Sequence, residues 1–474
     1  MKKITVLFLV FTTLTYAQTP CVNGFAGSYP CDGYDLLSHI TAAAMGASGG
    51  NDSWGWTDPQ DGKEYAIVGL DNGTAFIDIT DPVAPIYLGK LPSQTGSATA
   101  RDIKTYNDYA FVVSDNNGNH GMQIFDLTRL RSVANPPETF TVDALYSDFT
   151  NAHNLAINED TGYAYALRTN LFGGGVHFIN IQDPLNPINE GGVNGVFTHD
   201  AQIIIYDGPD TDYTGREILF SYNGFDQNVT IIDVTDKGSP QVISSFIYSQ
   251  NEHAHQGWVT ENHEYIIMGD ESDELNLGVD TRTIVVDISD LDNPTESFVY
   301  VGPTAASDHN GYVKEDTYYL ANYNAGMRVL DISGIGSGTL TETGYFDVYP
   351  ANNASGFNGA WSVYPYFESG NLVISVRGSA GGLFVVTESN IIGVTSFDHS
   401  SLFAITPNPA DEFITLTLNN GSTLISVNIY DSTGRLVLKD VNSTSVDIAS
   451  FNDGIYFVKV ETDQGIQTKR LIKQ

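Results

Sequence analysis

Short runs of alternating apolar and polar residues recur along most of the chain. In six related runs an apolar stretch is followed by Asp or Asn, and several runs continue to a second Asp and a Pro. They cover 75–82, 123–128, 177–184, 230–236, 284–290 and 328–333. A degraded seventh copy covers 383–387, and successive copies are 48, 54, 53, 54, 44 and 55 residues apart. Four short strands and their turns occupy about this length. The pattern predicts an all-β fold, a seven-bladed β-propeller over residues 18–387.

Each repeat is predicted to contain the same order of strands. A strand opened by a short polar motif comes first, an apolar strand such as 264–269 comes second, the run that ends in Asp comes third, and an outer strand such as 86–89 comes last. In a propeller the first strand lines the central channel, and the strands of the meander alternate in direction. The start of the first strand and the end of the second should therefore lie on one face.

The Asp that ends each third strand has two interpretations. Its carboxylate can accept hydrogen bonds from the backbone of the following turn, and Pro then sets the direction of the next strand. Alternatively, the repeated carboxylates bind Ca²⁺, which prefers oxygen ligands. We expect the turn, because it is the more economical account.

Four histidines, His153, His199, His255 and His309, occupy the same place in successive repeats. They are 46, 56 and 54 residues apart, and each opens the first strand of its repeat. Since first strands line the channel, the four imidazoles are expected at one channel mouth. The preceding repeat has Arg101 at the same place.

Further polar side chains are predicted to reach this face. His120 precedes the third strand of the second repeat, and Asp270 and Glu271 close a second strand. The other residues that close second strands are Asp115, Arg168, Tyr222, Asn322, Tyr323 and Arg377. We expect His120, Asp270 and Glu271 to support a site formed by the histidines.

Imidazoles gathered at one mouth favour a transition-metal site. Neutral His is a common ligand of Zn, Fe and Cu, and a second group usually orients its other ring nitrogen. The predicted ligands are His153, His199, His255 and His309. Whether side chains on four repeats converge on one ion does not follow from their period.

The residue after each histidine is polar but is not expected in the site. Neighbouring residues of a strand point to opposite faces. We therefore expect these side chains to bond adjacent repeats or backbone groups; they are Asn154, Asp200, Gln256 and Asn310.

Two other functions remain open at this stage, and so does catalysis itself. In the first, the protein is a polysaccharide lyase with His199 or His255 as base, Tyr323 as acid and Arg101 neutralising a uronate. Sugar rings could then stack on Trp54, Trp56, Trp258 and Trp361. In the second, the protein is a non-catalytic surface module that binds an extracellular small molecule or glycan.

The N-terminal residues predict export. A basic start at Lys2 and Lys3, an apolar run over 4–15 and small residues ending at Ala17 form a secretory signal, residues 1–17. This run is too short to span a bilayer, and we expect no membrane span elsewhere. Cys21 and Cys31 are the two cysteines, and an oxidising compartment favours a local disulfide between them.

The C-terminal residues 404–474 have an alternating pattern of their own. Short strands are predicted at 414–416, 427–430, 436–438 and 454–460, with breakers between them. The order Pro407-Asn408-Pro409, a Gly-Ile-Tyr strand at 454–456 and a Lys-rich last strand at 469–473 resembles the C-terminal sorting domain of the type IX secretion system of Bacteroidetes. This resemblance implies a small β-sandwich, contact with that secretion machinery, and release or attachment at the cell surface. Residues 388–403 are the predicted linker.

The net charge of −36 restricts the partners of the propeller. A surface of this charge repels nucleic acid and polyanionic polymers at long range and attracts cations. We therefore expect no nucleic-acid partner, and the charge favours the metal hypothesis over a uronate polymer.

Several motifs together resemble the choice-of-anchor B family and the related LVIVD repeat. They are Trp54-Gly55-Trp56, Arg101-Asp102-Ile103-Lys104, the four histidine motifs, Asp270-Glu271 and Ala321-Asn322-Tyr323. The chain departs from this pattern at Ala100, where Trp is expected before Arg101. The resemblance implies an exported propeller with a C-terminal anchor and leaves the reaction open.

Overall fold

The computed structural model describes residues 18–389, 403–418, 422–431, 434–462 and 465–474. The chain divides into two compact units, Met1–Ser389 and Asn390–Gln474. The predicted signal peptide, residues 1–17, lies outside the described residues, and so does most of the predicted linker. We describe each unit by itself.

The described part of the first unit consists of seven antiparallel sheets, which we call blades 1 to 7 in the order of their first strands. Blade 1 contains β4 (Gly50–Thr57), β5 (Glu64–Leu70), β6 (Gly73–Asp78) and β7 (Ile86–Pro92), with β11 (Glu138–Thr139) added parallel to β7. Blade 2 contains β8 (Arg101–Tyr106), β9 (Tyr109–Ser114), β10 (Met122–Asp126) and β12 (Ala144–Tyr146). Blade 3 contains β13 (Asn154–Asn158), β14 (Tyr163–Leu167), β15 (His177–Asn180) and β16 (Ile188–Gly192).

The remaining blades repeat this plan. Blade 4 contains β17 (Asp200–Ile205), β18 (Glu217–Tyr222), β19 (Val229–Asp233) and β20 (Gln241–Phe246), and blade 5 contains β21 (Ala254–Val259), β22 (Tyr265–Asp270), β23 (Arg282–Asp287) and β24 (Thr295–Val301). Blade 6 contains β25 (Gly311–Lys314), β26 (Thr317–Ala321), β27 (Met327–Asp331) and β28 (Thr341–Phe346), extended by β2 (Tyr29–Asp32) and β1 (Phe25–Ala26). Blade 7 contains β29 (Ala360–Tyr364), β30 (Asn371–Val376), β31 (Gly382–Glu388) and β3 (Tyr34–Ile40).

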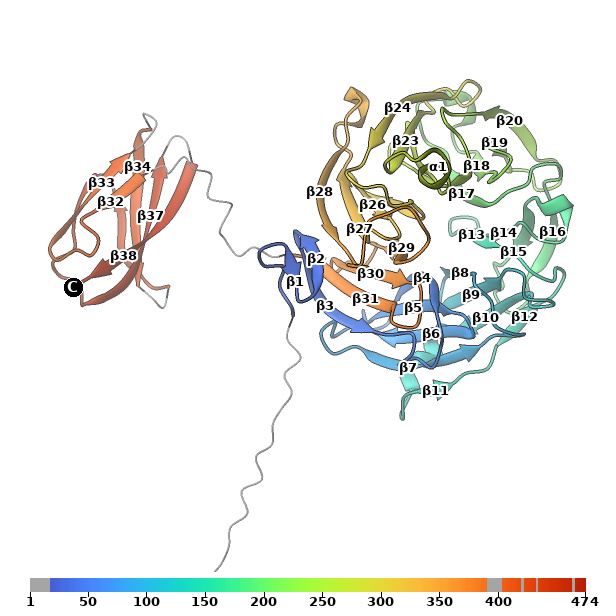
Figure 1. Cartoon of the computed structure of the whole chain (residues 1–474), viewed down its shortest axis with the longest axis horizontal. Helices are drawn as coiled ribbons and strands as arrows, with labels where there is room; N and C mark the ends of the chain where they lie inside the picture. Colours follow the sequence, from blue (N-terminus) through green and yellow to red (C-terminus); the bar gives the residue numbers. More distant parts are fainter. Residues whose placement is uncertain (1–17, 390–402, 419–421, 432–433, 463–464) are drawn as a thin grey trace, which may run out of the picture. The chain divides into compact units, whose positions relative to one another are not determined.

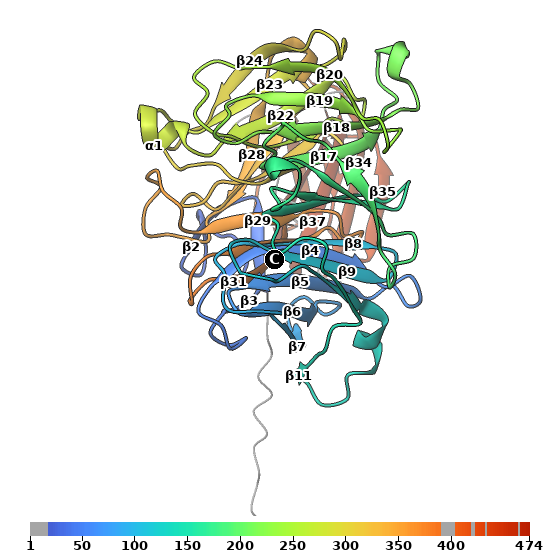
Figure 2. The ribbon, with the colours of Figure 1, turned by 90° about the vertical axis from the view of Figure 1, so that its right-hand side faces the viewer.

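The first strands of the blades surround the central axis of the ring, which we call the channel (Figure 1). Each contacts the first strand of the next blade, in the closed order β4, β8, β13, β17, β21, β25, β29 and back to β4. The short helix α1 (Asp273–Leu277) follows β22 and lies at one face of the ring, at the left of Figure 2. The all-β prediction and the predicted order of strands are confirmed.

Apolar side chains from neighbouring blades form the core between them. On blades 1 and 2, for example, Phe76 and Phe125 are fully buried and their rings stack with centroids 4.5 Å apart. Because both faces of a blade are covered by its neighbours, third strands such as β6 and β19 carry nearly continuous apolar runs.

Polar side chains join the first strands of adjacent blades. The Asn154 side-chain amide donates to the His199 carbonyl (3.0 Å). Gln256 forms two bonds with Gly311, donating to its carbonyl (3.0 Å) and accepting from its N–H (2.9 Å). The expectation that the residues after the histidines bond neighbouring blades is confirmed for these two amides.

The turn after each third strand is built as expected. The side chain of the last residue of each of these strands accepts a hydrogen bond of 2.8–3.0 Å from the backbone N–H two residues later, in six blades: Asp78, Asp126, Asn180, Asp233, Asp287 and Asp331. These carboxylates and the amide therefore hold the turns of the outer hairpins.

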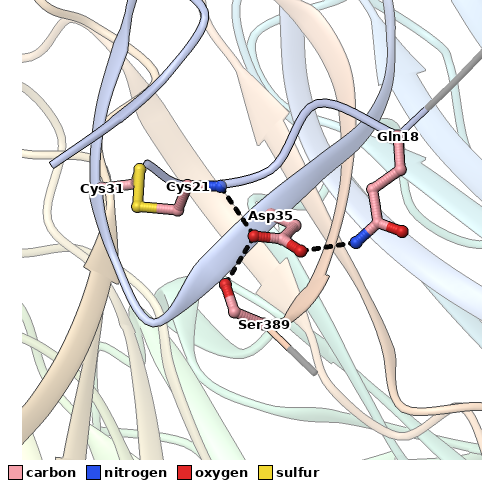
Figure 3. The surroundings of a disulfide bond; sticks show 5 residues. All are labelled: Gln18, Cys21, Cys31, Asp35 and Ser389. Carbon is pink, nitrogen blue, oxygen red and sulfur yellow. Dashed lines mark hydrogen bonds between the residues drawn. A yellow bond between two sulfur atoms is a disulfide. The ribbon is translucent and has the colours of Figure 1, made fainter. Parts of the chain in front are cut away.

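The N-terminal segment closes the ring. Strand β3 adds to the outer edge of blade 7 by pairing with β31, so one blade takes strands from both ends of the propeller. The predicted disulfide between Cys21 and Cys31 is formed (Figure 3). Beside it, the Asp35 carboxylate accepts from the Cys21 N–H (2.7 Å) and from the Ser389 hydroxyl (2.5 Å), which ties the first described residues to the last strand of the ring.

The second unit is a small β-sandwich. One sheet has the order β32 (Phe403–Thr406), β33 (Phe413–Leu418), β36 (Ser445–Asp447), and the other has the order β35 (Leu436–Val441), β34 (Leu424–Asp431), β37 (Gly454–Thr462), β38 (Gly465–Lys473). Both sheets contribute to one apolar core that includes Ile414, Val427 and Val458. The predicted strands of this unit are confirmed. In the described part of the chain, no helix has the length and apolar character needed to cross a bilayer.

Candidate functional site

The four histidines of the repeat form a continuous arc of imidazoles. Their ring centroids are 4.4 Å apart between His153 and His199, 4.6 Å between His199 and His255, and 4.3 Å between His255 and His309. Each histidine lies at the start of a channel-lining strand or within two residues before it. The fixed place in the repeat thus brings the rings of adjacent blades into contact.

A fifth imidazole, that of His253, joins the arc. Its ring centroid lies 4.8 Å from that of His199, and its Nδ1 lies 3.2 Å from a Glu271 carboxylate oxygen. The pairing of β21 with β22 shifts in register at His255, and such a bulge changes the direction of a side chain. The period of the repeats does not identify His253, although the His-Ala-His order of 253–255 is a local signal for it.

Hydrogen bonds at Nδ1 orient three rings of the arc. His309 donates to the Trp361 carbonyl (2.5 Å), His199 donates to the His255 carbonyl (3.1 Å), and His153 pairs with the Asp115 carboxylate (2.8 Å). When Nδ1 carries the proton, Nε2 keeps its lone pair, which is the arrangement of most metal-binding histidines. These bonds therefore leave the Nε2 lone pairs of three histidines available to a metal ion or to a hydrogen-bond donor.

Glu271, which directly follows β22, places a carboxylate among these nitrogens. Its oxygens lie 3.8 Å from His255 Nε2 and 3.9 Å from His309 Nε2. One donor atom from each of Glu271, His255 and His309 lies within 4.8 Å of the other two. The Tyr323 hydroxyl donates to the same carboxylate (2.7 Å), and Tyr323 has a positive φ of 24°, a strained conformation for a bulky residue.

Burial and neighbouring charges set the protonation of the cluster. Burial alone raises the pKa of Glu271, but the nearby imidazoles, with His253 first and His309 second, lower it to about 2. Burial lowers the pKa of His309 to about 4 and that of His255 well below its ordinary value. Around neutral pH Glu271 is therefore a carboxylate beside the neutral imidazoles of His255 and His309.

The cavity in front of these side chains is very small. It has a volume of about 10 Å³ and is lined by Asp52, Arg101, His153, His255, His309 and Trp361, among others. A cavity needs roughly this volume to hold one water molecule. This cavity therefore has room for a single ion or water. A larger cavity of about 640 Å³, lined by Asn51, Thr99 and Arg377 among others, lies next to it.

Arg101 lines the smaller cavity, but its guanidinium forms hydrogen bonds with other groups. Arg101 is 1% exposed, and it donates to the carbonyls of Leu70 (2.7 Å) and Asp71 (3.2 Å). His120 lies behind it, with Nε2 3.0 Å from the guanidinium and Nδ1 2.9 Å from the Gly121 carbonyl. These two residues hold the rim between blades 1 and 2.

Asp270 is also placed away from the imidazoles. Its carboxylate accepts from the backbone N–H groups of Glu252 (2.6 Å) and His253 (2.9 Å) and from the Tyr248 hydroxyl (2.7 Å). Asp270 therefore positions the segment that carries His253, whereas its neighbour Glu271 lies among the imidazoles.

The tryptophans considered as sugar contacts are divided among three places. Trp361 contacts His309, with centroids 4.8 Å apart, and Trp56 is buried in the core of blades 1 and 2. Trp54 and Trp258 line a different, larger cavity. The four indoles therefore do not form one surface.

Comparison with solved structures gives distant likenesses. The periplasmic gluconolactonase PpgL of Pseudomonas aeruginosa is 11% identical, with 71% of this chain and 88% of that chain covered and a TM-score of 0.45. A protein named "putative 6-phosphogluconolactonase" from Bacteroides uniformis is 11% identical, with 62% and 87% covered and a TM-score of 0.45. No curated protein matches the sequence.

Comparison with protein-family models identifies two parts of the chain. Residues 97–119 and 279–301 match the LVIVD repeat, and residues 404–474 match the secretion system C-terminal sorting domain. The predicted resemblance to LVIVD-repeat proteins with a sorting tail is confirmed. The chain thus carries LVIVD repeats and a type IX sorting domain, and it is secreted through that system to the cell surface or the extracellular space.

Proposed function

We propose that this secreted protein binds one divalent transition-metal ion at the mouth of its channel, through His255, His309 and Glu271. The observation that carries the proposal is the approach of three donor atoms to within 4.8 Å of one another. The two histidines of this set also line the cavity of about 10 Å³. The sequence suggests four imidazole ligands, and the proposal narrows this set to two imidazoles and a carboxylate. His153 and His199 continue the arc beside the ion.

The distances suit a small ion. A tetrahedral zinc ion with bonds of about 2.0–2.1 Å separates its ligand atoms by about 3.3 Å. His255 Nε2 lies 3.8 Å from one Glu271 oxygen and His309 Nε2 lies 3.9 Å from the other, each roughly 0.5 Å longer than this separation. One oxygen and the two nitrogens together lie within 4.8 Å of one another, so the three side chains must move closer to bind one ion. Two imidazoles and one carboxylate suit Zn, Fe or Cu and leave a coordination position open for water or a ligand.

The surroundings support the same ligand set. The bond from His309 Nδ1 to the Trp361 carbonyl orients that ring, and the Tyr323 hydroxyl orients the Glu271 carboxylate. Second groups of this kind usually change metal affinity about 10–100-fold. The net charge of −36 adds a long-range attraction for cations.

The metal-independent lyase has weaker support. It requires Arg101 to face a uronate, whereas the guanidinium donates to carbonyls and is 1% exposed. It also requires a sugar to reach His255, and the cavity that His255 itself lines holds about 10 Å³. We therefore assign metal binding and no reaction.

The test is a titration of the full chain, freed of metal, with Zn²⁺ by calorimetry. We expect one ion per chain, and an affinity lowered at least 10-fold by Glu271→Gln and by His309→Ala. Replacement of Zn²⁺ by Co²⁺ should give visible absorption typical of a four-coordinate site in the wild type. His263→Ala is the matched control, because His263 lies beside Tyr206, away from the arc.

Two results would contradict the proposal. One is a folded wild type that takes up no stoichiometric zinc. The other is an affinity that stays unchanged in both Glu271→Gln and His309→Ala.

A further inference from the structure

The other mouth of the channel holds a cavity of about 440 Å³. The channel-lining strands start at the histidine mouth, and their later residues line this cavity: Trp54 on β4, Lys104 on β8, Gln202 on β17, Trp258 on β21 and Tyr364 on β29. Its volume is in the range of pockets that bind drug-sized ligands, about 300–1,000 Å³. We call this cavity the aromatic pocket.

Four half-buried aromatic side chains give the pocket its character, and they pack on one another. The ring of Tyr364 lies 5.2 Å from that of Trp54, and the ring of Tyr366 lies 6.3 Å from Trp54 and 6.4 Å from Trp258. Gly55 lets Tyr364 lie directly on β4, because a Cβ at this position would be 2.1 Å from the tyrosine ring. These contacts hold the aromatic side chains in place before any ligand arrives.

Polar groups at the rim and floor retain bonding capacity. Glu159 is exposed, and its carboxylate has no hydrogen-bond partner within the described part of the chain. One oxygen of Glu261 accepts from the Glu315 N–H (2.7 Å). Gln202 lines the pocket, and its side-chain oxygen accepts from the Val259 N–H (2.7 Å), which leaves its amide N–H donors available. Hydroxyl groups are partners for both carboxylates and amides.

Lys104 separates the aromatic pocket from the histidine side. Its ammonium lies 4.6 Å from the Trp54 ring and pairs with Asp102 (2.5 Å), and Asp52 lies 3.8 Å away. Asp52 also lines the small cavity in front of the histidines. The face of Trp54 that would attract a cation is therefore already occupied by a cation of the protein itself.

We propose that the aromatic pocket binds an uncharged oligosaccharide. Indole and phenol rings offer flat apolar surfaces for the C–H face of a sugar ring, and the carboxylates of Glu159 and Glu261 and the Gln202 amide can bond its hydroxyls. Acidic groups at the rim and the net charge of −36 disfavour uronic or sulfated sugars. Secretion brings the pocket into contact with extracellular glycans.

The test is a calorimetric titration of the full chain with four neutral tetrasaccharides: maltotetraose, cellotetraose, mannotetraose and xylotetraose. We expect at least one to bind, with an affinity that changes little with salt. Trp258→Ala should lower this affinity at least 10-fold, and the milder Glu261→Gln should lower it less while keeping the fold. Tyr345→Ala, on the outer strand β28, should leave it unchanged.

The outcomes separate this proposal from the metal site. Sugar binding that persists in a chelator supports a pocket that acts without the ion. The proposal is overturned if none of the four tetrasaccharides binds, or if Trp258→Ala and Glu261→Gln both leave the affinity unchanged. It is also overturned if a choline salt binds at the pocket with strong salt dependence while the sugars do not.

Discussion

Replacement of His177 by Phe is expected to remove part of the acid sensitivity of the propeller. His177 starts β15, and its side chain is fully buried between the rings of Phe149 and Phe172. Its Nε2 lies 3.0 Å from the Tyr146 hydroxyl, and its Nδ1 has no partner in the described structure. Because this histidine lies outside the arc, its titration tests the effect of burial apart from the candidate metal site.

The size of the effect follows from the pKa. Burial lowers the pKa of His177 to about 4, whereas an unfolded histidine has a pKa of about 6.5. Between these values only the unfolded chain takes up a proton, so acid favours unfolding and stability is lost as pH falls from about 6.5 toward 4. A shift of about 2.5 pKa units corresponds to about 3.4 kcal/mol, of which about 2.5 kcal/mol is lost between about pH 7.5 and 4.5.

The assay is urea denaturation of the full chain at both pH values. The free energy of unfolding of wild type should fall by about 2.5 kcal/mol more than that of His177→Phe over this interval. Tyr146→Phe keeps the imidazole and should retain the wild-type loss. An equal loss in wild type and His177→Phe would refute the reasoning, whatever their stabilities at neutral pH.

Three other perturbations test the ion, the ring closure and the contacts between blades. Zn²⁺ at 100 times its Kd should stabilise the fold by about 2.7 kcal/mol. Divided by the unfolding entropy of residues 18–389, this free energy raises Tm by about 3 °C in a thermal scan. His255→Ala should abolish the rise. Cys21→Ser with Cys31→Ser opens a loop with a sequence separation of 10 and should cost about 2.7 kcal/mol in urea denaturation, with no change counting against it. Gln256→Ala leaves a Gly311 N–H and carbonyl without partners and should cost about 1–3 kcal/mol per buried group in the same assay.

The repeats could be predicted from sequence because each obeys local rules. Alternation defines the strands, and the side chain that ends each third strand forms the same bond in its turn, from Asp78 to Asp331. The place of the histidines follows from the same regularity, since equivalent residues of adjacent blades must be neighbours in a closed ring. The distances of 4.3–4.6 Å between adjacent imidazole centroids follow from that period.

The asymmetric features could not be predicted from the repeat. His253 joins the arc from just before β21, whose pairing with β22 shifts in register at His255, and no other copy of the motif has a second histidine two residues earlier. Asp270 and Glu271 are adjacent in sequence, yet the first accepts hydrogen bonds from the backbone of its own blade and the second lies among the imidazoles. The direction of each of these side chains depends on which nearby backbone groups need hydrogen-bond partners, and this cannot be read from the sequence alone.

Periodicity and convergence therefore contribute separately to the candidate site. A ring places one imidazole per blade along an arc, and an arc by itself distributes its nitrogens around the channel. An ion needs donors on more than one side, and in this protein the second side comes from Glu271, held by the Tyr323 hydroxyl of the next blade (2.7 Å). The metal affinity should consequently depend more on Glu271 than on His153, although His153 belongs to the repeated motif and Glu271 does not.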